Sequence, residues 1–234
     1  MESKTASGGW GNALRAAFPV TLPVLTGFAC LGLAYGLLME ARGYGPFWST
    51  LMSLVCYCGS MQYVAIALLT AAFDPLQAFL LSIMVNARHM FYGLSLLEQY
   101  KGMGAARFPL VYTLTDETFS LVSSVEVPGG VDRKKFYLSI SLLHYAYWAT
   151  ATLLGGLLGK ALTMDLTGVD FALTALFVVL FMEQWKHKAN RFSGTIGIAC
   201  AAVSLAVFGA EKLVIPAMVL ILAVLLGGRK RLCT

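Results

Sequence analysis

Eight long apolar runs, most of them without a charged side chain, divide this chain of 234 residues. Residues 18–39 form 22 consecutive positions without a formal charge, and residues 47–73 form 27. A helix needs about 20 apolar residues to cross the hydrocarbon core of a bilayer. Only 12% of the residues are charged, against roughly 25% in soluble domains, so a soluble fold of this size lacks the charges to cover its surface. The sequence therefore predicts an all-α integral membrane protein.

The runs predict six to eight transmembrane helices in a single transporter domain over residues 1–234, with both termini in the cytoplasm. If all eight runs cross, 11 lysines and arginines lie inside and five outside. If residues 47–73 and 108–125 are instead broken or re-entrant elements that return to the side they left, the division is 13 to three. The second division fits the positive-inside rule better. We favour broken elements at both places, because polar residues interrupt each of them. The remaining runs are residues 75–97, 136–159, 166–182, 192–210 and 213–228.

The charges and cysteines argue against several other classes of protein. A net charge of +5 does not indicate a nucleic-acid partner, because the basic residues lie between the apolar runs. The five cysteines form no cluster with histidine, so we expect no metal site and no cofactor. Residues 154–161 fail the phosphate-loop pattern, with Leu154 where glycine is required and Ala161 where serine or threonine is required. A transporter of this sequence would use an ion gradient or exchange, unless a partner supplies an ATPase.

The first polar interruption runs from residue 57 to residue 62. Glycine permits close backbone approach and weakens a helix. Serine and glutamine side chains both donate and accept hydrogen bonds. We predict a substrate-binding break in the helix here, and the alternative is a packing seam between helices. The predicted substrate-binding residues are Tyr57, Gly59, Ser60 and Gln62.

The second interruption, residues 85–93, places an arginine inside an apolar run. Arginine stays protonated and its planar fork of donors matches a carboxylate, whether that of a substrate or of Asp116 or Glu117. We therefore predict Asn86, Arg88 and Tyr92 as substrate-binding residues. His89 is a candidate for proton coupling, because its ordinary pKa lies near physiological pH. In the alternative interpretation Arg88 lies near a membrane face and only reaches for lipid headgroups.

The third interruption is the adjacent carboxylate pair Asp116 and Glu117. On a helix the two side chains point about 100° apart, so only one can pair with Arg88. The other can titrate or meet a substrate ammonium, and both are candidates for proton coupling. The alternative is an ordinary helix cap at the membrane edge. His144 and Trp148 are interpreted as a packed aromatic face rather than a proton relay.

Three motifs follow one another in an order and at separations typical of one membrane-protein family. They are Gly59-Ser60-Met61-Gln62-Tyr63, Val85-Asn86-Ala87-Arg88-His89-Met90-Phe91-Tyr92-Gly93-Leu94-Ser95 and Leu114-Thr115-Asp116-Glu117. With the proline-rich first run, they make the chain closely resemble the AzlC family over essentially its whole length. This family comprises the large subunits of bacterial branched-chain amino-acid exporters.

The resemblance implies a secondary transporter that exports leucine, isoleucine and valine, with methionine as a further candidate, across the bacterial inner membrane. It implies the proton motive force as energy source and a small hydrophobic AzlD-like membrane subunit as partner. It carries no residue roles, so the site residues depend on the burial argument. We also expect apolar residues around Tyr35, Met61 and Tyr92 to receive the substrate's aliphatic side chain. The alternatives are a channel and an integral-membrane enzyme that uses His89, Asp116 and Glu117 for acid–base chemistry; we expect no enzyme.

Overall fold

The computed structural model describes residues 9–70, 74–161, 188–209 and 219–224, together with positions 178, 181, 182, 185, 213, 216 and 217. Within these residues the regular structure is helical, as the sequence predicts. The chain forms two compact units, Met1–Asp74 with Val85–Leu166, and Pro75–Met84 with Thr167–Thr234. The helices are α1 (Trp10–Ala41), α2 (Gly45–Val55), α3 (Gly59–Thr70), α4 (Pro75–Ser95), η1 (Gly104–Ala106), α5 (Arg107–Tyr112), α6 (Asp116–Ser124), α7 (Arg133–Ala161) and α9 (Lys188–Phe208).

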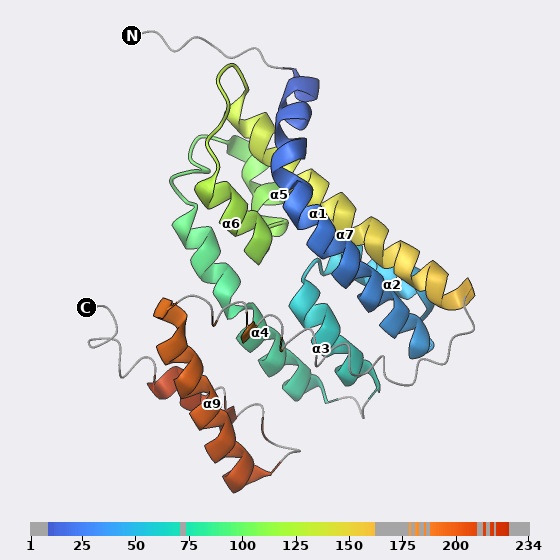
Figure 1. Ribbon diagram of the computed structural model, residues 1–234, viewed down its shortest axis with the longest axis vertical. Helices are drawn as coiled ribbons and strands as arrows, with labels where there is room; N and C mark the ends of the chain where they lie inside the picture. The colour runs from blue at the N-terminus through green and yellow to red at the C-terminus, as the bar shows by residue number, and fades with distance from the viewer. Residues whose placement is uncertain are drawn as a thin grey trace. The chain divides into compact units, whose positions relative to one another are not determined.

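The first unit is built on α1 and α7, which lie side by side along their length (Figure 1). Glycines allow this close approach. A Cβ added at Gly36 would collide with the α7 backbone at Thr152 and Gly156, and one at Gly155 would collide with the α1 backbone at Leu33. Small residues that let two helix backbones touch are the usual contact between membrane helices. The two longest described helices therefore form one packed pair, against which α2 also packs.

The described part of the run 47–73, up to residue 70, is a broken element, as predicted. α2 begins with Pro46 in its first turn and ends at Val55, and α3 starts again at Gly59. The interruption lies at residues 56–58 and so overlaps the beginning of the predicted stretch 57–62, whose residues 59–62 form the first turn of α3. Tyr57 makes the break, because its φ of 39° lies in the left-handed region that cannot continue a right-handed helix.

Residues 108–125 are broken as well. α5 ends at Tyr112 and α6 starts at Asp116. Thr115 has an extended backbone, and its hydroxyl accepts a hydrogen bond from the Thr118 amide, a regular N-cap. Thr113 is the C-cap of α5. The predicted interruption is therefore confirmed, and the carboxylates Asp116 and Glu117 occupy the first turn of the second half-helix.

A cluster of buried apolar residues forms a core of the first unit. It joins the connection after α4 to α5, α6 and the beginning of α7. Fully buried members include Leu96, Leu110, Val122, Phe136 and Ile140. This core holds the α5–α6 break against α7, and so it supports the polar residues at the start of α6.

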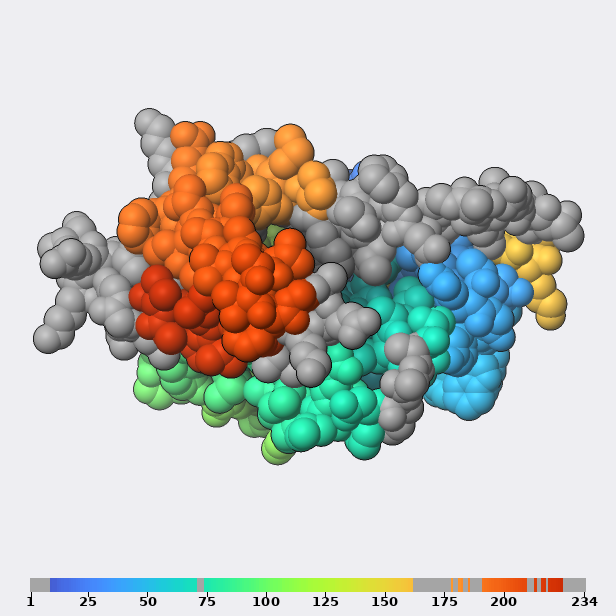
Figure 2. Space-filling view, turned by 90° about the horizontal axis from the view of Figure 1, so that it is seen from below, coloured from blue at the N-terminus to red at the C-terminus, as the bar shows by residue number. Residues whose placement is uncertain are grey.

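In the second unit, α9 is an apolar helix (orange in Figure 2). Among the described residues two helices are long and apolar enough to cross a bilayer, Trp10–Ala41 and Arg191–Phe208. The predicted runs 166–182 and 213–228 lie largely outside the described residues, so the expected number of six to eight spans stays a prediction. Exposed apolar side chains of α9 include Phe192, Ile198, Val203, Leu205, Val207 and Phe208.

Candidate functional site

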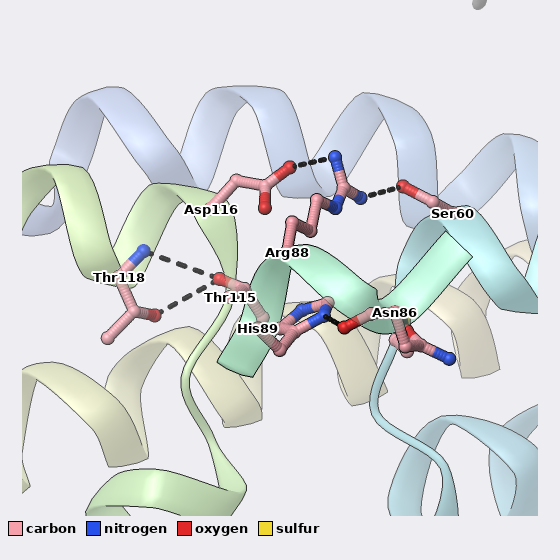
Figure 3. A network of polar contacts seen from close by, with 8 residues as sticks. Ser60, Asn86, Arg88, His89, Thr115, Asp116 and Thr118 are labelled. Carbon is pink, nitrogen blue, oxygen red and sulfur yellow. Dashed lines mark hydrogen bonds and ion pairs between the residues drawn. The ribbon is translucent and has the colours of Figure 1, made fainter. Parts of the chain in front are cut away.

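Arg88 of α4 joins the two broken elements. Its Nη1 lies 2.7 Å from Oδ2 of Asp116, the first residue of α6. Its Nη2 donates a 2.7 Å hydrogen bond to Oγ of Ser60, in the first turn of α3 (Figure 3). Of the two interpretations of Arg88, the structure shows contact with a predicted acidic partner, Asp116, and it adds Ser60, which was not predicted as a partner of Arg88. Three motifs that are distant in sequence thus meet at one guanidinium.

The amino-terminal ends of two half-helices meet at this guanidinium. Asp116 begins α6 and Ser60 lies in the first turn of α3, so a side chain from the first turn of each helix contacts Arg88. The amino-terminal end of a helix carries about half a positive charge. Interrupted helices of transporters commonly direct such ends at the anionic group of a substrate. With Arg88 added, this part of the molecule favours an anion, and the Asp116 carboxylate occupies that position here.

The ion pair has unused hydrogen-bonding capacity. The atoms Nε of Arg88 and Oδ1 of Asp116 are buried and have no hydrogen-bond partner among the described residues. The two side chains as a whole are 40% and 39% exposed, so a small molecule can reach them. An unpaired buried polar atom costs roughly 1–3 kcal/mol. A ligand with a negative and a positive group could satisfy both atoms. The described residues contain no group of three potential metal ligands.

The other predicted residues of α4 lie around the arginine. Oδ1 of Asn86 accepts a 2.8 Å hydrogen bond from Sγ of Cys58, and the Asn86 carbonyl oxygen lies 3.3 Å from Nδ1 of His89. The Tyr92 ring lies edge-on to His89, at 5.7 Å, and stacks on Phe119 of α6, at 4.5 Å. Asn86 therefore holds the α2–α3 break against α4. Tyr92 and Phe119 provide an aromatic surface beside the ion pair.

Tyr57 and Glu117 are a second pair near the breaks. Tyr57 is buried, its ring packs 4.9 Å from that of Tyr145, and its hydroxyl has no hydrogen-bond partner among the described residues. The Glu117 carboxyl hydrogen-bonds the Thr115 side chain and interacts electrostatically with Tyr57. Asp116 thus makes the ion pair, while its neighbour Glu117 has different partners. This division agrees with the predicted divergence of the two side chains.

Gln62 has different partners from Ser60. Its Oε1 accepts a 2.9 Å hydrogen bond from Nε1 of Trp148, and its Nε2 donates one of 2.9 Å to Oγ of Ser53. Ser53 in turn donates to Thr152 at 2.9 Å. A Cβ added at Gly59 would lie 3.1 Å from the Trp148 ring, the close approach that the alternative of a packing seam expects at this glycine. Gln62 and Gly59 therefore fix α3 to α7.

Several residues that matter here had little or no signal in the sequence. The hydroxyl of Tyr112 donates to the carbonyl oxygens of Leu54 and Val55, at 2.7 and 2.8 Å, and that of Tyr145 donates to Leu54 at 2.7 Å. These carbonyls end α2 and have no partner within the helix. Tyrosines are ordinary in such runs, so only the folded chain shows their role.

The predicted aromatic face of α7 is confirmed. Phe28 of α1 lies edge-on to both His144, at 5.8 Å, and Trp148, at 5.4 Å. His144 also makes a polar contact, because its Nδ1 shares a 2.8 Å hydrogen bond with Oγ1 of Thr118. The spacing of four residues shows that 144 and 148 share a face of the helix. It does not show what that face contacts.

Comparison with known proteins shows which family of membrane proteins the chain is similar to. The family model described as AzlC protein matches residues 23–162. The chain is 40% identical to the branched-chain amino acid transport protein AzlC of Bacillus subtilis over 220 residues, 94% of this chain and 87% of that protein. It is 40% identical to an uncharacterized membrane protein of Helicobacter pylori (strain 26695), over 94% of this chain and 97% of that one. The inner membrane protein YgaZ of Escherichia coli is 26% identical over 78% of this chain and 76% of its own. No solved structure is significantly similar. Helical structure and membrane-protein relatives together make the chain an all-α membrane protein.

Proposed function

Because the chain belongs to the AzlC family, we propose that it is the large subunit of a secondary exporter of branched-chain amino acids. Leucine, isoleucine and valine are the proposed substrates, with methionine as a further candidate. The proposed location is the bacterial inner membrane, with both termini in the cytoplasm. A small hydrophobic AzlD-like subunit completes the transporter, and the proton motive force drives it.

The arrangement of Arg88, Asp116 and Ser60 at two half-helix ends carries this proposal. An amino acid is a zwitterion, with a carboxylate and an ammonium on neighbouring atoms. Arg88 and the amino-terminal end of α3 suit the carboxylate, because both attract negative charge. Oδ1 of Asp116 is an unpaired acceptor that suits the ammonium. The substrate thus inserts into the ion pair and replaces one internal contact by two external ones.

The aliphatic side chain is proposed to lie against Tyr92 and Phe119, whose stacked rings adjoin the ion pair. Tyr35 is not part of this surface. It is fully buried on α1, and its hydroxyl donates to Sδ of Met52. An apolar surface of this kind separates substrates that differ by a methylene by only about 1–3 kcal/mol. One protein can therefore accept several branched-chain amino acids.

Proton coupling is proposed to follow from competition. Asp116 can hold the substrate ammonium or a proton but not both, because a protonated carboxyl group no longer attracts an ammonium. His89 and Glu117 are the other candidate carriers, since both lie within the same cluster of motifs. A proton that replaces the departing substrate at Asp116 is expelled when the ion pair with Arg88 forms again.

Transport by the purified protein tests the proposal. The chain is reconstituted into vesicles with and without the small subunit, and loaded leucine is followed under an imposed pH gradient. Saturable, gradient-dependent leucine flux that the small subunit increases supports the proposal. Flux without saturation or coupling indicates a channel, and chemical conversion of leucine in detergent indicates an enzyme. No leucine, isoleucine or valine flux in any combination contradicts the substrate assignment.

A further inference from the structure

Two residues of α7, one helical turn apart, each hold one of the half-helix ends that meet at Arg88. His144 bonds to Thr118 in the first turn of α6, at 2.8 Å. Trp148 donates to Gln62 in the first turn of α3, at 2.9 Å. Residues four apart on a helix lie on one face, separated by about 6 Å along its axis. One face of α7 therefore contacts both ends.

The contact with α6 extends to its cap. Oγ1 of Thr118 lies 3.2 Å from Oγ1 of Thr115, and this Thr115 oxygen also accepts from the Thr118 amide. Asp116 lies between these two threonines in the chain. His144 and Thr118 are both fully buried, so no water competes for their hydrogen bond. His144 thereby fixes the turn that presents Asp116 to Arg88.

The contact with α3 has both a polar and a steric part. The indole nitrogen of Trp148 bonds to Gln62, and the indole ring lies where a side chain at Gly59 would be. Ser60, the partner of Arg88, lies between these two residues. Phe28 packs edge-on against both His144 and Trp148 and restrains their rings. Trp148 thereby fixes the turn that presents Ser60.

We infer that His144 and Trp148 are positioning residues that set the spacing between the two helix ends around the substrate. The inference rests on the proposed function, because the spacing matters only if a substrate binds between the two helix ends. Its structural part, that each residue holds one half-helix, can be tested without transport. Neither residue contacts Arg88 or Asp116 in the described structure. Each acts through the half-helix that it holds. Losing one contact should loosen one half-helix and leave the other in place.

Hydrogen exchange of the purified protein tests the structural part. His144→Phe keeps an aromatic ring and removes Nδ1, and we expect amide exchange in residues 113–119 to rise about fivefold, the effect of one lost hydrogen bond. Trp148→Phe should raise exchange by a similar factor in residues 59–64 and not in residues 113–119. Thr118→Val removes the first bond from its other partner and should reproduce the His144→Phe pattern. Exchange that rises equally in both segments, or in neither, overturns the inference.

A matched control lies between the two residues. The hydroxyl of Tyr147 shares a 3.1 Å hydrogen bond with Thr21 of α1, so Tyr147→Phe removes a bond from α7 without touching either half-helix. It should change exchange in neither segment. His144→Asn restores a polar group close to the position of Nδ1 and should recover the wild-type pattern. If Asn and Phe at position 144 behave alike, the hydrogen bond does not position α6.

Transport kinetics complete the test. We expect the KM for leucine to rise about fivefold in His144→Phe and in Trp148→Phe, with the maximal rate per folded molecule unchanged, because an unfavourable spacing weakens binding first. A fall in maximal rate with KM unchanged overturns the inference. If the wild-type protein moves no leucine, the proposed function fails, and the exchange data alone then decide whether α7 positions the two ends.

Discussion

Arg88 offers the most direct test of the proposed site. Replacing it with glutamine removes the charge and keeps a side chain of similar polarity. In the folded chain the guanidinium makes two contacts of 2.7 Å, to Asp116 and Ser60. If a substrate carboxylate takes the place of one of these partners, the variant loses a hydrogen bond between charged groups. Such a bond contributes about 1.5–3 kcal/mol.

The exposure of the Arg88–Asp116 ion pair determines how large a loss of leucine affinity we expect in Arg88→Gln. Surface ion pairs contribute up to about 1 kcal/mol, whereas breaking a buried one costs about 3–5 kcal/mol. The side chains of Arg88 and Asp116 are 40% and 39% exposed, between these limits. We therefore expect a loss of about 2 kcal/mol, which is roughly thirtyfold in apparent affinity for leucine. Arg88→Lys keeps the charge but gives up the bond to Ser60, so about a fivefold loss is expected.

Leucine titration of flux in vesicles measures both variants. Lys101→Gln is the matched control, because it also removes one positive charge, but from a side chain that is 76% exposed and that pairs, among the described residues, with the nearby Glu98. Its apparent affinity should equal that of the wild type. If Arg88→Gln stays within twofold of the wild type, or if Lys101→Gln loses as much affinity as Arg88→Gln, the argument from the ion pair is wrong.

Three further predictions concern other parts of the first unit. Asp116→Asn should keep leucine exchange but lose accumulation driven by a pH gradient, and accumulation at the wild-type level in vesicles would exclude Asp116 as the proton carrier. Gly36→Ala forces a Cβ into the α7 backbone and should lower the free energy of unfolding in detergent by about 1–3 kcal/mol. Gly27→Ala, on the same helix with open space at Cβ, should be neutral or stabilising, and equal losses in both contradict the packing argument. Tyr57→Phe removes a buried hydroxyl that has no partner among the described residues, so stability should stay unchanged or rise. Because Tyr57 is a predicted substrate contact, we expect the affinity for leucine to fall about fivefold. Tyr63→Phe loses a 2.6 Å hydrogen bond to the Leu31 carbonyl oxygen of α1, so its stability should fall and its leucine affinity should stay unchanged. Leucine titration of flux and unfolding in detergent compare the two variants.

The helical architecture and both broken elements could be predicted from the sequence, because a polar interruption of an apolar run is costly in a membrane and therefore visible. The first break was predicted over residues 57–62, and the structure confirms only the beginning of this stretch. Residues 59–62 form the first turn of α3, where glycine and serine are well tolerated. The break comes from the left-handed backbone of Tyr57, which no property of tyrosine predicts.

The meeting of Arg88 with an acidic residue was one of two predicted outcomes, and the structure shows it with Asp116. Sequence could not choose between Asp116 and Glu117, because the choice depends on how α6 is rotated against α4. The same limit applies to Gln62, which was grouped with Ser60 as a substrate-binding residue. Its amide is engaged by Trp148 of α7 and Ser53 of α2. Its role as a direct substrate contact stays a prediction.

The tyrosine hydroxyls at the end of α2 have a consequence for the energy supply. A gap in a membrane helix exposes carbonyl groups, and any such group left to water draws solvent into the bilayer. Here Tyr112 and Tyr145 bind the carbonyl oxygens of Leu54 and Val55 directly. These two carbonyl oxygens therefore need no water molecule as a partner. Under the proposed proton coupling this matters, because a standing file of water through the gap would dissipate the gradient.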